Sequence, residues 1–203
     1  YEKLYGFWLG QCIANWTGLS TEMDKIGNVG DSNSGDFYTR NDWGGLSTRT
    51  EKRIDFVLKS PDEIWGSDDD TDIEYMYQYL MSQDHDILSA ERIRNGWLKH
   101  IKKDEENFLW VSNQRAFDLM KDEVFPPDTG SKELNEFYEM IDAQLTTEIF
   151  GLFAPGREDY ARKLSHLPIR TTARENAAWI SEFYVTMHSL ASTVDQSQSM
   201  KDQ

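Results

Sequence analysis

The sequence predicts an all-α fold, a compact assembly of several helices, from two observations. Apolar residues recur at helical spacing along most of the 203-residue chain; Ile73, Met76, Tyr77 and Leu80, for example, fall at i, i+3, i+4 and i+7. No series of segments shows the alternating pattern that is typical of strands, and no internal repeat or clear domain boundary interrupts the chain. We therefore expect one domain over residues 1–203.

The first expected helix spans residues 3–17 and carries small residues on one face. Gly6, Gly10 and Ala14 lie four positions apart, and Gly18 follows one step further. Glycine costs about 1 kcal/mol relative to alanine in a helix interior. The stripe therefore indicates either close packing of another backbone or a ligand.

Residues 24–50 are rich in Gly, Ser, Asn and Asp and lack apolar periodicity, so they are expected to form a long loop. Helical patterns return after it, and Pro126, Pro127 and Gly130 predict a break at 125–131. The later helices are expected after Asp70, from a Ser89 cap to about His100, and over 105–122, 132–153, 157–165 and 172–192.

The last of these helices should place one set of side chains inward. That set is Ala177, Ile180, Phe183 or Tyr184, and Met187. A polar tail over 193–203 follows it.

Composition excludes several classes of partner. The net charge is −15, which repels nucleic-acid phosphates and anionic lipid, so we expect neither a nucleic acid nor a membrane as partner. No apolar run approaches the roughly 20 residues that a membrane span needs. The single cysteine, Cys12, rules out an internal disulfide and fits a reducing compartment, so a cytoplasmic location is expected.

The most unusual segment is WGSDDDTDIEYMYQYL, residues 65–80. Five acidic residues fall within seven positions, and they are Asp68, Asp69, Asp70, Asp72 and Glu74. A capping box of Thr71 and Glu74 would explain one or two of them. The remaining carboxylates repel one another unless a divalent cation lies among them. Oxygen ligands suit Mg²⁺, Mn²⁺ or Ca²⁺, and no nearby Cys or His arrangement favours zinc.

One family with such clusters on helical folds is the terpene and prenyl synthases. Asp68, Asp69 and Asp72 resemble their Asp-Asp-x-x-Asp motif. That motif normally lies within a helix, whereas glycine and serine precede the acids here and indicate a junction between a loop and a helix.

A second resemblance covers more of the chain. The segments YGFWLGQCIANWTGLSTE (5–22) and DDDTDIEY (68–75) resemble the opening helix and the first metal motif of ADP-ribosylglycohydrolases. Residues 141–167 and 177–191 resemble two later helices of that family, in the same order. The resemblance implies an orthogonal helical bundle. It also implies hydrolysis of the glycosidic bond that joins ADP-ribose to a protein or to a small-molecule acceptor.

The resemblance also implies roles for individual residues. Asp68, Asp69 and Asp70 would bind Mg²⁺, with Mn²⁺ as an alternative, and a complete family member holds two ions. Glu22 and Asp69 would be catalytic, and Gly18 and Asp72 would bind substrate. Glu22 equally fits an exposed acid at a helix end, and Asp72 equally fits an acid behind the metal ligands or at a helix N-terminus.

The chain departs from the family pattern in two ways. Asn15 and Ala14 replace the usual Asp and Gly of a turn, and Asp68 stands where Thr is usual. No second Asp-x-Asp-Thr-like motif follows Asp72. We therefore expect a domain truncated on its C-terminal side. A catalytically silent member of the same fold that serves as a binding or structural module is the alternative.

Overall fold

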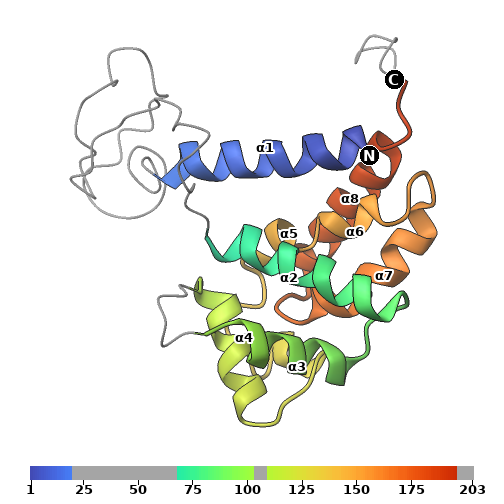
Figure 1. The fold of residues 1–203 in the computed structure, drawn as a ribbon. Coiled ribbons are helices and arrows are strands. Elements are labelled where there is room, and N and C mark those ends of the chain that lie inside the picture. The colour runs from blue at the N-terminus through green and yellow to red at the C-terminus, as the bar shows by residue number, and fades with distance from the viewer. Residues whose placement is uncertain (20–67, 103–108, 196–203) are drawn as a thin grey trace, which may run out of the picture. The chain divides into compact units, whose positions relative to one another are not determined.

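The computed structural model describes residues 1–19, 68–102 and 109–195, shown as coloured ribbon in Figure 1. Among these residues there are helices and turns but no strand, which confirms the all-α prediction. By internal contacts the chain divides into two units, Tyr1–Ser67 and Asp68–Gln203. The expectation of one domain over the whole chain stays a prediction. None of the helices described is long and apolar enough to cross a membrane.

The first unit contributes one described helix, α1 (Glu2–Leu19), which matches the expected helix over 3–17. Within it, the rings of Phe7 and Trp8 meet edge to face, with centroids 5.5 Å apart. The expected loop over 24–50 and the predicted catalytic Glu22 lie outside the described residues.

The second unit is built around α8. Its elements are α2 (Asp69–Asp84), α3 (Ala90–His100), α4 (Val111–Lys121), the 3₁₀ helix η3 (Asp128–Gly130), α5 (Asp142–Thr146), α6 (Ile149–Leu152), α7 (Glu158–Arg170) and α8 (Glu175–Ala191). Helix α8 packs against α5, α6 and α7 (Figure 1). Helix α2 packs against α5 and α3, and α4 packs against α3 and η3.

Helix α2 buries the face that its periodicity predicts. Ile73, Met76, Tyr77 and Leu80 are all in the core. The Tyr77 hydroxyl accepts a hydrogen bond from Trp97 Nε1 at 3.1 Å, and its ring meets Phe150 edge to face. Burial raises the pKa of Tyr77 to about 12, although hydrogen bonds with Trp97 and Thr171 act in the opposite direction.

Helix α3 begins as its sequence predicts. Ser89 is the N-cap, and its Oγ accepts a hydrogen bond from the backbone N–H of Arg92 at 3.1 Å. Ile93 and Trp97 of this helix are fully buried.

The helix expected over 132–153 is wrong in extent. Residues 131–141 form turns, and only the short helices α5 and α6 follow. The buried Asn135 side chain competes with a helix here, because it donates to the carbonyls of Ser112 and Thr129 and accepts from the N–H of Phe137. Only the bond to Ser112 spans a long stretch of sequence, and together the three hydrogen bonds stabilise turns here.

Two helix boundaries also differ from expectation. Helix α4 starts at Val111, although the sequence predicts a start near 105. Residues 109 and 110 precede the helix, and residues 105–108 lie outside the described part of the chain. Helix α7 continues through Pro168 to Arg170, although the sequence predicts an end at 165. Proline costs a helix one hydrogen bond, but its φ is helical, and here Pro168 and Ile169 are buried.

The predicted inward face of α8 is wrong. Ala177 is buried as expected, but the large residues Ile180, Phe183 and Met187 are exposed, Phe183 to 58%. The buried side chains are small ones apart from a single valine, namely Ala177, Ala178, Ser181, Val185 and Ser189. Small residues face inward because α6 lies very close, so the side with the least bulk fits best.

Candidate functional site

The acidic segment forms the start of α2, but no capping box forms there. The N-cap is Asp68, and its side chain makes no capping hydrogen bond. Glu74 instead points into the core, where its Oε1 accepts a hydrogen bond from the backbone N–H of Ile149 at 2.8 Å. The interpretation that Thr71 and Glu74 cap the helix is therefore wrong.

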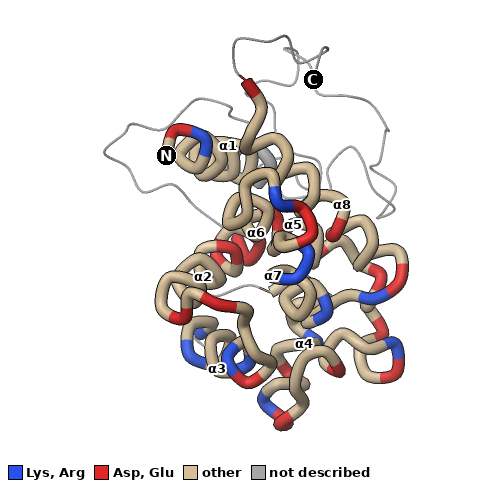
Figure 2. The backbone as a smooth tube through the Cα atoms, turned by 90° about the vertical axis from the view of Figure 1, so that its right-hand side faces the viewer, with Lys and Arg blue, Asp and Glu red and all other residues tan. Residues whose placement is uncertain are grey.

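Three of the acids converge. Asp68, Asp69 and Asp70 each place a carboxylate oxygen within 4.8 Å of the others. Asp69 is buried, and the other two are partly exposed. Helix α2 contains no Lys or Arg, as the red and tan tube in Figure 2 shows, so its own sequence offers no cation to balance these charges.

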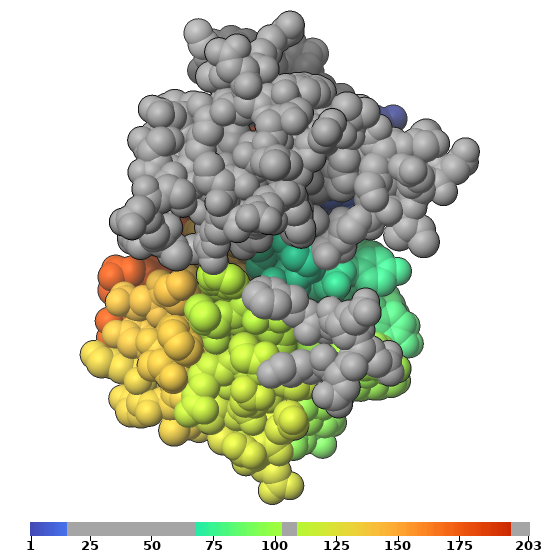
Figure 3. All heavy atoms as spheres, turned by 90° about the vertical axis from the view of Figure 1, so that its left-hand side faces the viewer, coloured from blue at the N-terminus to red at the C-terminus, as the bar shows by residue number. Residues whose placement is uncertain are grey.

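Asp69 is held by the start of α4. Its Oδ2 accepts hydrogen bonds from the backbone N–H of Trp110 at 2.6 Å and from Asn113 Nδ2 at 2.9 Å. The backbone N–H of Asn113 in turn donates to Asp142 Oδ1 at 3.3 Å. The starts of α2 and α4 lie side by side in Figure 3, in teal and yellow-green. A buried polar group therefore joins α2, α4 and α5.

Sequence reasoning missed Asn113 and Asp142. Asn113 lies 44 residues from Asp69, and nothing in its local pattern marks it as different from an ordinary helix asparagine. Asp142 lies in the segment 141–167, which resembles a helix of ADP-ribosylglycohydrolases, but it is not part of an acidic cluster in the sequence. A buried acid in an apolar context is the one signal that could have drawn attention to it.

The pKa of Asp142 is raised. The main cause is burial, and the negative charge of Asp69 adds to it. Hydrogen bonds from the backbone N–H of Asn113 and from Asp142's own backbone act in the opposite direction but do not cancel the effect. The fold therefore favours the protonated form of this carboxyl.

The raised pKa predicts a pH-dependent effect of Asp142→Asn. A carboxyl whose folded pKa lies above its ordinary value of 3.8 contributes stability that is present below that value and is lost as pH rises through the folded pKa. Asparagine keeps an acceptor oxygen for the N–H of Asn113 and cannot ionise. We expect the variant to gain stability over the wild type as pH rises from about 4 toward neutrality.

Urea unfolding followed by circular dichroism, in EDTA and at several pH values, measures this gain. A difference between variant and wild type that stays constant across the range would contradict the prediction.

The residues present fit a hard divalent cation. Carboxylate oxygens are the ligands that Mg²⁺ and Mn²⁺ prefer, and three of them converge here. A further buried oxygen, Asn113 Oδ1, has no hydrogen-bond partner among the residues described. A buried acceptor of this kind normally binds water or an ion, so it is compatible with a solvated cation nearby.

Asp72 lies one turn further along α2 and is not part of the converging group. It lines a hollow of about 320 Å³ together with Tyr75, Tyr79 and His100. The rings of Tyr79 and His100 meet edge to face with centroids 5.3 Å apart. Gly18 lies in α1, in the other unit, and its predicted contact with substrate stays a prediction.

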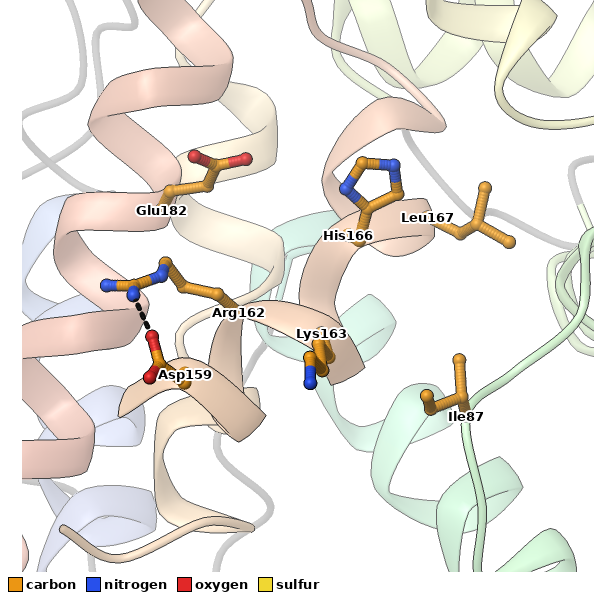
Figure 4. Close-up of a pocket in the computed structure, with 7 residues that line it drawn as sticks. All are labelled: Ile87, Asp159, Arg162, Lys163, His166, Leu167 and Glu182. Carbon is orange, nitrogen blue, oxygen red and sulfur yellow. Dashed lines mark hydrogen bonds and ion pairs between the residues drawn. The ribbon is translucent and has the colours of Figure 1, made fainter. Parts of the chain in front are cut away.

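A second hollow, of about 610 Å³, lies along α7 and contains none of the predicted site residues. Figure 4 shows its lining, in which Arg162 is paired with Asp159. Burial lowers the pKa of His166, and the charge of Arg170 adds to this effect, so the imidazole favours its neutral form. The ionic groups on this side are largely satisfied by one another, since Arg170 also pairs with Glu182 at 2.8 Å.

Three comparisons with known proteins found no similar protein. No protein-family model, no curated protein and no solved structure matches the chain.

Proposed function

We propose that the chain carries a cation-binding part of a Mg²⁺-dependent hydrolase that cleaves the glycosidic bond of ADP-ribose attached to a protein or a small molecule. The observation that carries the proposal is the convergence of Asp68, Asp69 and Asp70 at the start of α2. The resemblance of segments 5–22 and 68–75 to ADP-ribosylglycohydrolases supplies the substrate class and the ADP-ribosylglycohydrolase-like helical bundle.

The position of the three acids fits a cation site better than it fits a helix cap. Capping would use these carboxylates for the N–H groups of their own helix, but Asp69 accepts from α4 instead. Two N–H donors on Oδ2 hold the carboxylate in one orientation. The charge cost of gathering three carboxylates is then offset by the cation.

In this proposal each described residue has a defined task. Asp68, Asp69 and Asp70 would hold Mg²⁺ or Mn²⁺, which supplies a positive charge beside the sugar and an acidified water. Asp69 can offer only Oδ1, because Oδ2 is occupied by two N–H groups. Asp72 and the tyrosines of the adjacent hollow would contact the substrate. Glu22 and Gly18 keep the roles that the resemblance implies.

The geometry favours this proposal over a terpene synthase. The Asp-Asp-x-x-Asp motif would use Asp68, Asp69 and Asp72, whereas the converging set contains Asp70 and not Asp72. A terpene synthase would release diphosphate from an isoprenoid diphosphate, and we expect no such release from this chain.

Release of ADP-ribose tests the proposal. We expect release of ADP-ribose from an ADP-ribosylated protein or small molecule by a polypeptide that joins this chain to a second Asp-x-Asp-Thr-like motif, when Mg²⁺ is present and not in EDTA. Asp69→Asn plus Asp70→Asn should weaken Mn²⁺ binding by more than about 100-fold, since even the outer partners of metal ligands are worth about 10–100-fold. Isothermal titration calorimetry measures the binding, and chromatography measures the release.

A matched control removes two carboxylates at the C-terminal end of α2. Asp84→Asn plus Asp86→Asn changes acids that bond Arg92 and the N–H of Ile87, so binding and release should stay unchanged. Mn²⁺ binding without any release would contradict the hydrolase and support the catalytically silent module. Absence of Mn²⁺ binding to the wild type would contradict the site itself.

A further inference from the structure

We propose that Asn113 is a positioning residue for Asp69, which it orients so that one carboxylate oxygen is reserved for a divalent cation. The inference rests on the cation site proposed above and extends it to a residue 44 positions away. It depends on the hydrogen bonds around Asp69 and on the burial of Asn113 and Asp142.

The first step concerns the two carboxylate oxygens of Asp69, which have different partners. Oδ2 accepts from Trp110 N–H and from Asn113 Nδ2, at 2.6 and 2.9 Å. Two donors on one oxygen fix the plane of the carboxylate. A carboxylate held in this way binds a cation through its other oxygen, in one orientation, and loses little rotational freedom when it does so.

The second step is the support of Asn113 itself. Its side chain is fully buried, and its backbone N–H donates to Asp142 Oδ1 at 3.3 Å. Asp142 is also buried, with 1% of its surface exposed. Asn113 is thus fixed by α5 from behind while its amide nitrogen faces Asp69. Partners of this kind set the orientation and basicity of metal ligands.

The third step concerns a buried oxygen of Asn113 that has no hydrogen-bond donor among the described residues. Asn113 Oδ1 is buried in the polar group that contains Asp69, and no hydrogen-bond donor reaches it from the part of the chain that the structure describes. A buried amide that is fully satisfied within a protein also has a donor for its carbonyl oxygen, and within the described ranges Asn113 lacks one. A carbonyl oxygen left over at this place suits a water molecule that a cation would hold.

A matched asparagine separates positioning from simple stability. Asn135 is also fully buried, and its Nδ2 donates to the carbonyl of Ser112, which adjoins Asn113 in α4. Asn135 therefore supports the same helix without touching Asp69. Asn113→Leu and Asn135→Leu each remove one buried amide of equal size, so both should lower the free energy of unfolding.

Only the Asn113 variant should affect the cation. We expect Asn113→Leu to weaken Mn²⁺ binding by about 10–100-fold and Asn135→Leu to leave it within about 2-fold of the wild type. Isothermal titration calorimetry measures the affinity, and electron paramagnetic resonance of bound Mn²⁺ reports the ligand geometry. The Asn113→Leu spectrum should differ from the wild-type spectrum, and the Asn135→Leu spectrum should match it.

If Asn113→Leu does not fold, Asn113→Ser takes its place, because serine keeps a polar group but is too short to reach Asp69; the same loss is expected. Wild-type affinity and an unchanged spectrum in the folded Asn113 variant would overturn the inference while leaving the cation site standing. Equal losses in the Asn113 and Asn135 variants would also overturn it, because stability alone would then explain the effect. If wild-type protein takes up no Mn²⁺, the proposed cation site fails, and the inference fails with it.

Discussion

Gly151→Ala is expected to destabilise the second unit by about 3 kcal/mol or more. A Cβ atom at this position would lie 2.4 Å from the carbonyl oxygen of Val185 and 2.8 Å from the backbone nitrogen of Ser189. Both obstacles are backbone atoms of α8, so no side-chain rotation relieves the clash. The gain in helix propensity from replacing glycine is only about 1 kcal/mol and does not compensate. Thermal unfolding followed by circular dichroism measures the loss.

Gly96→Ala is the matched control for this prediction. A Cβ atom at Gly96 would also be too close to its neighbour, at 2.6 Å, but that neighbour is a terminal methyl carbon of Leu80. A side-chain end can move where a helix backbone cannot, so we expect a smaller loss from Gly96→Ala. Equal unfolding temperatures for the two variants would contradict the prediction that backbone obstacles cost more than a movable side chain.

The second large effect is expected at Glu74. Glu74→Ala removes a fully buried side chain and leaves a cavity beneath α2. It also removes the acceptor for the backbone N–H of Ile149, at the start of α6. An unpaired buried N–H costs about 1–3 kcal/mol, and the cavity adds to this, so we expect a total loss of about 3 kcal/mol. Urea unfolding measures it.

Glu74→Gln separates the hydrogen bond from the charge. Glutamine keeps the size of the side chain and an oxygen that can accept from Ile149, but it carries no charge. We expect it to retain most of the stability that Glu74→Ala loses, because both the acceptor and the volume of the side chain are kept. If the Gln variant is as unstable as the Ala variant, the charge itself matters and the N–H of Ile149 does not explain the effect.

Residues close in sequence determined the parts that could be predicted. The spacing of Ile73, Met76, Tyr77 and Leu80 placed the buried face of α2, and Ser89 placed the start of α3. The acidic cluster was also visible, because Asp68, Asp69 and Asp70 are consecutive and share one end of a helix. Helical geometry relates residues within about one turn, so a local pattern suffices for such features.

Residues far apart in sequence decided the rest. The spacing of large apolar residues in α8 predicted an inward face with Ile180 and Met187. The small residues of α8 face inward instead, because Gly151 on α6 approaches its backbone closely. The sequence by itself therefore determined that the chain is helical and where its acids gather. Only the tertiary structure decided that Asn113 and Asp142 lie behind Asp69. The physical reason is that packing and buried hydrogen bonds depend on which helix lies opposite, and a local pattern carries no record of that neighbour.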